Sequence, residues 1–412
     1  MDIYILDKTT RTVLDIVDGF ESVIWTPRYY EPGDFEIYIK ATEKNLSILR
    51  EDNYVKRYDS DMVGIIESVE LTTDVESGDY IIAKGRCVKS LLERRIVWNR
   101  TSVKGTVESC IRNLIMENLI APTLEYRTLP NFVLGDAQEY TETLDAQYLG
   151  ENLLEIVVAL CKAYDYGWKV ILNADNDFEL QLYKGVDRSF NQTENPFVVF
   201  SSTFENIISS NYMFDKSTLR NACNVGGEGE GSSRKFYGVG NASGVDRREM
   251  FVDASDISTV TEMSFTFNGN GISKTFNFGR TVDSVESVMV NNREVDSSTY
   301  TVNTSSITFT EAPTKRKVIK VTGNFSWTTE EYNNLLIERG REEIANNKAT
   351  ESFEGEVESL RQFVLGRDYN LGDVVSVRNE YGITSNPRII ETIESIDANG
   401  RKIIPTFASW EV

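Results

Sequence analysis

The chain contains no histidine, and this absence removes several kinds of catalytic and metal chemistry at once. Histidine is the commonest general base and the commonest metal ligand in proteins. Zinc sites, and nucleophiles activated by a neighbouring histidine, therefore have no such residue to use. A carboxylate pair or a lysine can still act, but no spacing among the acidic residues singles out such a pair. We expect a protein that is not an enzyme, with no catalytic residues, metal site or cofactor.

Cysteine is scarce as well, and no C-x-x-C pair occurs among Cys87, Cys110, Cys161 and Cys223. The first three lie in apolar, patterned segments, which is typical of reduced cysteines in a core. Disulfides and cysteine metal sites are therefore not expected. Reduced thiols fit assembly in a cytoplasm.

Long apolar runs are also missing. The most apolar segment, residues 153–160, is far shorter than the roughly 18–20 residues that a membrane-spanning helix needs. Residues 1–7 lack the basic start and the apolar run of a signal peptide. We expect no membrane span, and lysis of the producing cell rather than secretion as any route out of it.

The 43 basic residues are outnumbered by 64 acidic ones, and the formal net charge is −21. Duplex DNA carries about one negative charge per 1.7 Å of its axis, so the chain as a whole should repel nucleic acid. It should also avoid an anionic membrane surface. Solubility alone can explain this charge.

What the chain has in quantity is aromatic and β-branched residues, including 19 Tyr, 20 Phe and 5 Trp, and 40% hydrophobic residues. This composition is globular and favours strands. Alternation at Phe35, Ile37 and Ile39 predicts a half-buried strand. Helical spacing predicts helices over 106–119, 149–164 and 330–346, and a short helix over 42–50 with Leu46 and Leu49 facing inward.

At 412 residues the chain should divide into roughly two to four domains. Strand and helix patterns divide it into five parts. We expect an N-terminal β domain at 1–90, an α/β middle module at 91–195, a β segment at 196–256, an inserted small β domain at 257–326, and a helix with a C-terminal β domain at 327–412. The fold class is therefore mainly β with α/β parts.

Two segments imitate ligand-binding loops but fail in detail. The glycine-rich run 226–231 lacks the lysine of a phosphate-binding loop, and Glu228 and Glu230 place negative charge where phosphates would lie. Residues 173–177 begin like a calcium loop, but Phe178 and Lys184 occupy the positions of its glycine and its last glutamate. Both segments are interpreted as turns between strands.

Four segments together resemble the baseplate hub, or tail-associated tail-tip, proteins of long-tailed bacteriophages. The first has the pattern W-x-x-R-Y-x-x-x-G-D-F and the second G-x-x-x-x-x-L-L-x-x-R. The third is a glycine-rich turn with a following arginine, and the fourth lies near the C-terminus. The residues that carry the resemblance are Trp25, Arg28, Tyr29, Gly33, Asp34 and Phe35; Gly85, Leu91, Leu92 and Arg95; Asn221, Gly226, Gly227, Gly229, Gly231 and Arg234; and Gly372, Asp373, Pro405 and Phe407.

The resemblance implies a structural tail-hub subunit of the virion, made in the cytoplasm of a bacterial host. It implies two barrel-like β domains, one tail-tube-like barrel at 1–90 and one after 350, with residues 196–256 completing one or both. It implies a homotrimer that joins a sixfold tail to threefold distal parts and lets DNA pass through an acidic channel. The implied partners are the distal tail ring protein, other baseplate or fibre proteins and a tape measure protein. Stable nucleic-acid binding is not implied.

Two other functions stay open. Residues 257–326 match no part of the family, and Phe265, Phe267, Phe276 and Phe278 there can form either the core of the insert or a receptor- or carbohydrate-binding surface. We favour the core, because a small domain needs its aromatic residues for burial. A peptidoglycan-cleaving enzyme would need a buried carboxylate with a raised pKa in a cleft. Longer family members carry a lytic region toward their C-terminus, and we expect none in this sequence, which extends to Val412.

Overall fold

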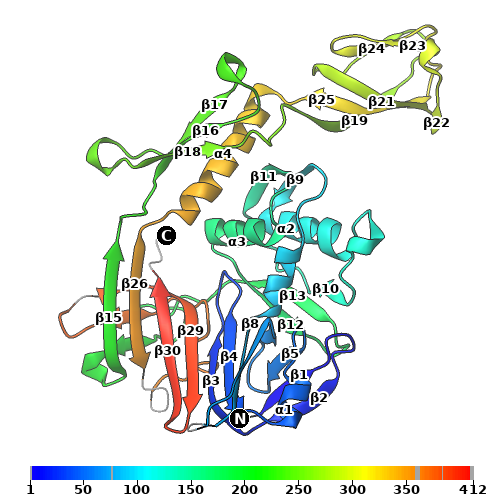
Figure 1. Cartoon of the computed structure of the whole chain (residues 1–412). Helices are drawn as coiled ribbons and strands as arrows, with labels where there is room; N and C mark the ends of the chain where they lie inside the picture. The colour runs from blue at the N-terminus through cyan, green and yellow to red at the C-terminus, as the bar shows by residue number, and fades with distance from the viewer. Residues whose placement is uncertain (1, 76–77, 358–361, 383, 409–412) are drawn as a thin grey trace.

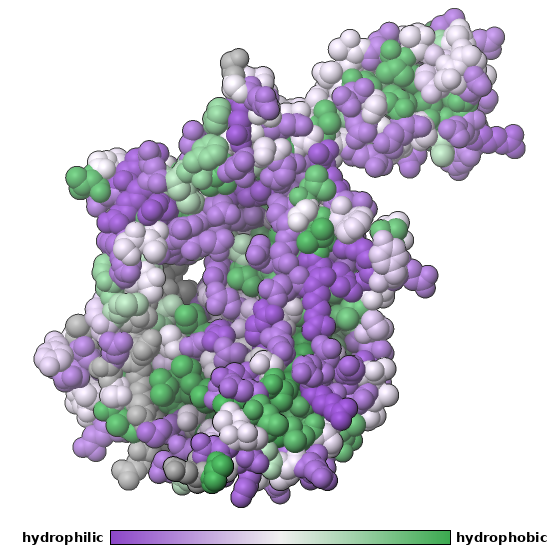
Figure 2. Space-filling view, in the orientation of Figure 1, coloured by the Kyte–Doolittle hydropathy of each residue, from purple (hydrophilic) through white to green (hydrophobic). Residues whose placement is uncertain are grey.

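The computed structural model describes residues 2–75, 78–357, 362–382 and 384–408. It is mainly β, as the composition predicts. Figure 1 shows a body that contains the first and the last strands of the chain, and a small lobe that projects away from it beyond the helix α4 (Thr329–Asn346). Figure 2 shows the lobe joined to the body by a narrow neck, and apolar side chains gathered over the lower body.

The N-terminal residues form two packed β layers. The alternating residues Phe35, Ile37 and Ile39 all face the core between the layers, as predicted. The short helix α1 (Glu43–Ile48) is capped by Thr42. Of the two residues predicted to face inward, Leu49 is buried, but Leu46 is 38% exposed, and Ile48 faces the core instead. One layer contains β1 (Ile3–Leu6), β2 (Val13–Val17), β5 (Tyr54–Arg57) and β6 (Val63–Ile65), and the other β3 (Phe20–Thr26), β4 (Asp34–Lys40), β7 (Ser68–Thr72) and β8 (Tyr80–Arg86).

The second of these layers is half of a larger sheet. Strand β3 pairs with the late strand β29, so the first and last parts of the chain share one eight-stranded sheet. Its other half contains β15 (Ile207–Asp215), β26 (Thr350–Val357), β29 (Arg388–Asp397) and β30 (Gly400–Ala408). A second core, with Phe200 and Phe407, lies between that half and the small sheet of β14 (Val199–Ser201), β27 (Ser376–Arg378) and β28 (Thr384–Ser385). Over the described residues no sheet closes into a barrel.

The middle module has the largest core, and two helices form within the predicted ranges, although the one predicted over 149–164 begins four residues later, at Leu153. Cys110 and Cys161 are buried in this core, and Cys87 is buried as well, as expected for these three cysteines. Cys223, for which no burial was predicted, is also buried, and all four are unpaired. Its elements are η1 (Val88–Arg94), β9 (Thr101–Thr106), α2 (Val107–Ile115), the π-helical turn η2 (Met116–Ile120), η3 (Glu125–Arg127), β10 (Phe132–Leu134), β11 (Thr143–Tyr148), α3 (Leu153–Tyr164), β12 (Gly167–Leu172) and β13 (Phe178–Tyr183).

Residues 196–256 contribute to two places. Strands β14 and β15 join the sheets of the body, whereas β16 (Ala222–Gly226), β17 (Phe236–Val239) and β18 (Glu249–Asp253) form a separate sheet. That sheet packs on α4 through Val225, Leu335 and Leu336. Short turns of 3-10 helix connect these strands at η4 (Ser202–Phe204), η5 (Gly231–Ser233) and η6 (Gly244–Asp246). The boundaries of the five predicted parts remain a prediction.

The insert forms the projecting lobe of Figure 1. Phe276 and Phe278 are buried, and Phe265 and Phe267 pack against the same core, so these aromatic residues serve the core of the insert. They form no exposed aromatic surface. Its elements are β19 (Val260–Asn268), β20 (Thr275–Asn277), β21 (Val282–Val290), β22 (Arg293–Glu294), η7 (Ser297–Thr299), β23 (Tyr300–Val302), β24 (Ser306–Phe309) and β25 (Val318–Ser326).

Candidate functional site

The motif residues of the first segment begin inside the N-terminal core. Trp25 and Phe35 are buried neighbours with ring centroids 5.7 Å apart. The indole Nε1 of Trp25 donates a hydrogen bond to Ser60 Oγ at 3.0 Å. These two aromatic residues therefore fix where the β3–β4 connection, residues 27–33, leaves the core.

Glycines hold this connection close to its neighbours. A Cβ on Gly85 would lie 1.7 Å from the carbonyl oxygen of Ile65, so only glycine fits there. The backbone N–H of Gly33 donates to Cys87 Sγ at 3.1 Å, and its carbonyl accepts from the Cys87 N–H at 2.7 Å. The first and second motif segments are thus bonded to each other directly.

Tyr29 is the central residue of the site. It is fully buried in a slot formed by Gly167, Gly185 and Gly372, which come from the middle module and the C-terminal part. A Cβ on Gly167 would lie 2.1 Å from the Tyr29 ring, and one on Gly372 would lie 2.3 Å from it. The Gly185 N–H donates to the Tyr29 hydroxyl at 3.2 Å. Tyr29 therefore joins three parts of the chain.

Lys89 holds the backbone of the same connection. Its Nζ donates to the carbonyl oxygens of Arg28, Tyr29 and Glu31 at 2.9, 3.2 and 3.0 Å. The ammonium also lies 4.6 Å from the centroid of the Trp168 ring. Burial lowers the pKa of Lys89 to about 8, because no carboxylate is bonded to it among the described residues.

Ion pairs surround the tyrosine slot. Arg28 pairs with Glu391 on β29 at 2.5 Å and with Asp34 on β4 at 2.7 Å. Arg388 pairs with Asp165, which ends α3 in a left-handed conformation. These pairs link the N-terminal layer, the middle module and β29.

Asp373, from the fourth motif segment, accepts hydrogen bonds from neighbouring backbone and side-chain groups through its carboxylate. It accepts from the N–H of Val186 at 2.8 Å, from the N–H of Asn370 at 2.9 Å and from Arg188 Nε at 2.8 Å. Its side chain is 2% exposed. Such a carboxylate stabilises a buried loop and is already occupied by its donors.

The remaining motif residues lie elsewhere. Leu91 and Leu92 are in the core of the middle module, and Pro405 and Phe407 lie on the buried side of β30. Arg95 lies at the end of η1, away from the tyrosine slot, where its Nε donates to the carbonyl of Arg127 at 2.8 Å.

The glycine-rich segment is a clamped turn beside α4. Arg234 donates to the carbonyls of Gly226 and Gly227, both at 2.9 Å, and also pairs with Asp253. Gly229 and Gly231 have φ values of +112° and +53°, which glycine tolerates best. Asn221 accepts from the Arg248 N–H at 2.8 Å.

The Tyr332 hydroxyl of α4 donates to Ile257 O at 3.0 Å and accepts from the Glu228 N–H at 2.8 Å. A Cβ on Gly227 would lie 2.3 Å from that hydroxyl oxygen. Together with the arginine clamp, these contacts agree with the interpretation of the segment as a structural turn.

Sequence patterns did not identify several residues of the site. Asp165, Gly167 and Gly185 belong to no motif segment, and their roles depend on a tyrosine more than a hundred residues away. Lys89 and Arg388 lie within the motif segments, but no role was predicted for them.

A groove of about 840 Å³ lies beside the slot, between the three parts. Its carboxylates are paired: Asp59 with Arg57 at 2.8 Å, Asp61 with Lys169 at 2.5 Å, and Glu394 with Arg57 at 3.0 Å. Burial raises the pKa of Asp59, but Arg57 outweighs it and holds that pKa below its usual value. Such paired carboxylates are poor general acids.

Burial raises the pKa of Glu342 to about 7, and burial also raises the pKa of Glu151. Both carboxylates lie between α4 and the middle module rather than in the groove.

Over the described residues there is also no cluster of metal-ligating side chains, and no helix is long and apolar enough to cross a membrane. The site is an arrangement for joining parts of a structure.

Comparisons with known proteins agree with a tail-protein fold. The 43 kDa tail protein of prophage MuSo2 from Shewanella oneidensis is similar with a TM-score of 0.52 and 10% identity, covering 99% of this chain and 98% of that chain. A tail protein from Neisseria meningitidis MC58 gives a TM-score of 0.51 and 11% identity, covering 99% and 96%. Identities this low show the fold alone. No curated protein sequence matches the chain.

The family model described as "Siphovirus ReqiPepy6 Gp37-like protein" matches residues 2–408. The resemblance to tail proteins of long-tailed phages is thereby confirmed, and the chain is a structural protein of phage-tail type. Because the match extends over nearly the whole chain, the protein belongs to the siphovirus ReqiPepy6 Gp37-like family.

Proposed function

We propose that the protein is a tail-hub subunit whose three copies form a ring between the sixfold tail tube and the threefold distal parts. The observation that carries this proposal is the eight-stranded sheet with β7 at one edge and β15 at the other. Each edge strand has one partner among the described strands. An unpaired edge is a template for pairing with another chain.

The directions of the strands support a closed ring. Every pairing in the sheet is antiparallel, so the two edge strands of an eight-stranded sheet run in opposite directions. Placing β7 of one copy beside β15 of the next therefore continues the antiparallel pattern across the boundary. A head-to-tail contact of this kind closes into a ring when the rotation fits.

The edge strands also expose apolar side chains that such a contact would cover. Ile208, Met213 and Phe214 on β15 are 61%, 46% and 50% exposed, and Leu71 on β7 is 49% exposed. Long edges with exposed apolar residues promote aggregation unless they are paired. Each half of the large sheet has four strands, so three copies present six similar units. Six units match the sixfold symmetry of the tail tube, and three copies match the threefold symmetry of the distal parts.

The proposed channel is lined by the open face of the large sheet. The described side chains on that face include the acidic residues Asp34, Glu36, Glu70, Asp215, Glu391 and Asp397 and the basic residues Lys40, Lys84, Arg86 and Lys402, so acidic residues are in the majority. Lys84 pairs with Glu36 at 2.9 Å and Arg86 with Glu67 at 2.9 Å. Cations that are already paired neutralise phosphates weakly, so DNA should slide past them.

The partners in this proposal are the distal tail ring protein above the hub, other baseplate or fibre proteins below it, and the tape measure protein in the channel. The place of action is the tail tip of the virion. The barrel-like character of the two β units, and the completion of the second one by β14 and β15, belong to the same proposal.

Electron microscopy of the negatively stained protein tests the proposal, alone and mixed with the distal tail ring protein. We expect threefold rings with a central hole, either with the protein alone or once the distal tail ring protein is added. Particles that stay single in the presence of the ring protein would overturn the hub assignment. Deleting residues 257–326 should leave the rings intact, because the insert has its own core; loss of host binding with intact rings would instead favour a receptor-binding insert.

A further inference from the structure

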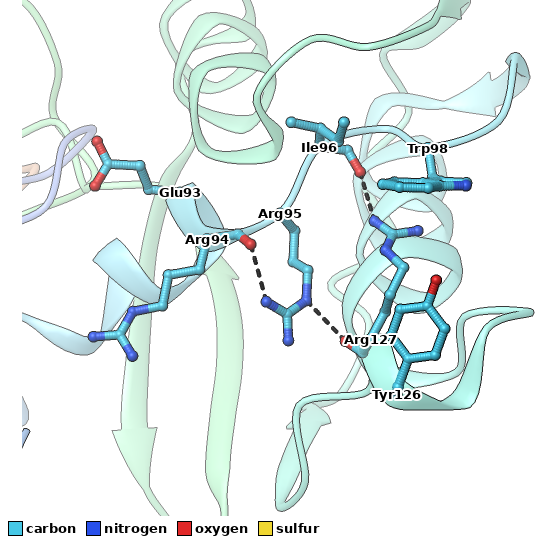
Figure 3. Close-up of a pocket in the computed structure, with 7 residues that line it drawn as sticks. All are labelled: Glu93, Arg94, Arg95, Ile96, Trp98, Tyr126 and Arg127. Atoms are coloured by element: carbon cyan, nitrogen blue, oxygen red, sulfur yellow. Dashed lines mark hydrogen bonds between the residues drawn. The ribbon is translucent and has the colours of Figure 1, made fainter.

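A small pocket on the middle module carries an unusual concentration of positive charge. Its volume is about 370 Å³, and it lies where η1 ends and leads to β9, opposite η3. Figure 3 shows the side chains that line it: Glu93, Arg94, Arg95, Ile96, Trp98, Tyr126 and Arg127. The guanidinium groups of Arg95 and Arg127 lie in this pocket, on a chain whose net charge is −21, whereas that of Arg94 points away from them and pairs with Asp52 at 3.5 Å.

Two of these arginines have no acidic partner within the part of the chain that the structure describes. Arg95 donates to the carbonyls of Arg127 and Arg94 at 2.8 and 2.9 Å, and Arg127 donates to the carbonyl of Ile96 at 2.8 Å. Glu93, the carboxylate at the rim, is paired with Arg86 at 2.7 Å. A guanidinium has five N–H donors, so donors of both arginines stay available for an incoming group.

This arrangement is costly for the free protein. The Arg127 residue is only 9% exposed, and charge buried without a counter-charge is unfavourable. Burial, followed by the charges of Arg127 and Arg94, lowers the pKa of Arg95. A bound anion would remove this repulsion, so part of the binding energy is already stored in the free pocket.

Aromatic side chains flank the cations. The Arg127 guanidinium lies 4.8 Å from the centroid of the Trp98 ring, and Figure 3 shows Trp98 and Tyr126 beside it. Trp98 is 49% exposed and Tyr126 is 80% exposed. Exposed aromatic residues next to arginine are the residue types enriched in the energetic centres of protein interfaces.

The backbone that carries these side chains is held firmly. The N–H of Trp98 donates to Asn118 Oδ1 at 3.1 Å, and the carbonyl of Arg95 accepts from the N–H of Leu153 at 3.0 Å. The neighbouring Val97 is buried and bonded to the carbonyl of Glu151 at 3.0 Å. A pocket on such a support is preformed and loses little entropy when it binds.

We propose that this pocket docks an acidic peptide segment of another tail protein, with a carboxylate between Arg95 and Arg127 and an adjacent apolar side chain against Trp98 and Tyr126. The inference rests on the proposed role as a tail subunit, since that role supplies the neighbouring protein. Arginine binds carboxylates through two parallel hydrogen bonds, which gives both strength and orientation.

Two other ligand classes fit less well. An acidic polysaccharide also presents hydroxyl donors, and the pocket offers almost only donors, because its one carboxylate is already paired with Arg86. Nucleic acid is repelled by the net charge of −21. A volume of about 370 Å³ suits one or two side chains of a peptide.

The test is a titration of the full chain with the acetylated, amidated tripeptide Glu-Phe-Glu and with its Gln-Phe-Gln counterpart, followed by calorimetry. Arg95→Gln and Tyr126→Ser are the test variants, and Arg293→Gln, an exposed arginine on the insert, is the matched control. Tyr126→Ser should fold normally because that side chain is mostly exposed. Circular dichroism checks the fold of each variant.

We expect the Glu peptide to bind about tenfold more tightly than the Gln peptide, as one charge-assisted contact provides. Each test variant should weaken binding by about tenfold, and Arg293→Gln should not change it. Equal binding of both peptides, or no binding at millimolar peptide, overturns the proposal. Loss of the ring in Arg95→Gln or Tyr126→Ser also overturns it, because the pocket would then belong to the contact between copies. Binding without ring formation would contradict the hub assignment alone.

Discussion

Arg57 on β5 donates to the carboxylate of Glu394 on β29 at 3.0 Å, across 337 positions of sequence. The Arg57 side chain is completely buried, and that of Glu394 is 7% exposed. Arg57 also pairs with Asp59 and lies 5.5 Å from the centroid of the Trp25 ring. The contact joins the N-terminal β layer to the last strands of the chain inside the protein.

Removing the acidic partner of this pair should destabilise the protein strongly. Glu394→Ala leaves the buried Arg57 with Asp59 alone, and we expect a loss of about 2–4 kcal/mol in the free energy of unfolding. Urea unfolding followed by circular dichroism measures it. Arg401 is the other partner of Glu394, and its side chain is 47% exposed. Arg401→Met should therefore lower the free energy of unfolding by less than about 1 kcal/mol. Equal effects of the two variants would show that the buried pair has no special role.

The tyrosine slot predicts a strict requirement for glycine. Gly167→Ala places a methyl group 2.1 Å from the Tyr29 ring, so we expect a loss of about 3 kcal/mol or more, or insoluble protein. Combining it with Tyr29→Ala should not add the two losses, because the clash disappears. Gly238→Ala is the control, since nothing lies within 4 Å of the new Cβ. Additive losses in the thermal unfolding of the double variant would contradict the slot.

Glu342 should make stability depend on pH. Its carboxylate accepts from the Tyr148 hydroxyl at 2.5 Å between α4 and β11, and burial raises its pKa to about 7 from the ordinary 4.5. The folded state then holds the proton more tightly than the unfolded state. Stability from this group is complete below about pH 4.5 and is lost as the pH rises through 7, by an amount on the order of 3 kcal/mol.

Glu342→Gln cannot lose a proton, so this variant should be more stable than the unmodified protein at pH 8 and show a flatter profile between pH 5 and 8. Melting temperatures across that range measure the effect. The exposed Glu262 provides the control, and Glu262→Gln should leave the profile unchanged. A parallel shift of the whole curve in Glu342→Gln would assign the effect to packing instead of titration.

The edge strands predict which substitutions block the ring. Leu71→Lys on β7 or Phe214→Lys on β15 puts charge on an exposed edge position and should abolish trimers while the subunit stays folded. Light scattering after size exclusion, with the distal tail ring protein present, gives the mass. Ile272→Lys, at an 84% exposed position of the insert, should assemble normally. Normal trimers of both edge variants would place the subunit contact elsewhere.

Local patterns in the sequence identified elements well when burial follows from a short repeat. Phe35, Ile37 and Ile39 alternate and are buried, and the helix of residues 330–346 begins within one residue of its predicted start. The prediction that Leu46 faces inward was wrong because α1 turns Ile48, together with the following Leu49, toward the core. The aromatic residues of the insert were correctly interpreted as its core.

The sequence by itself determined the β-rich character, the buried unpaired cysteines, the acidic charge and the family, since each depends on composition or on short motifs. Only the tertiary structure decided that β3 and β29 are neighbours in one sheet, and that Gly167, Gly185 and Gly372 enclose Tyr29. The reason is physical: strand pairing and close packing depend on which distant segments meet, and no local repeat in a chain encodes its partner across hundreds of residues.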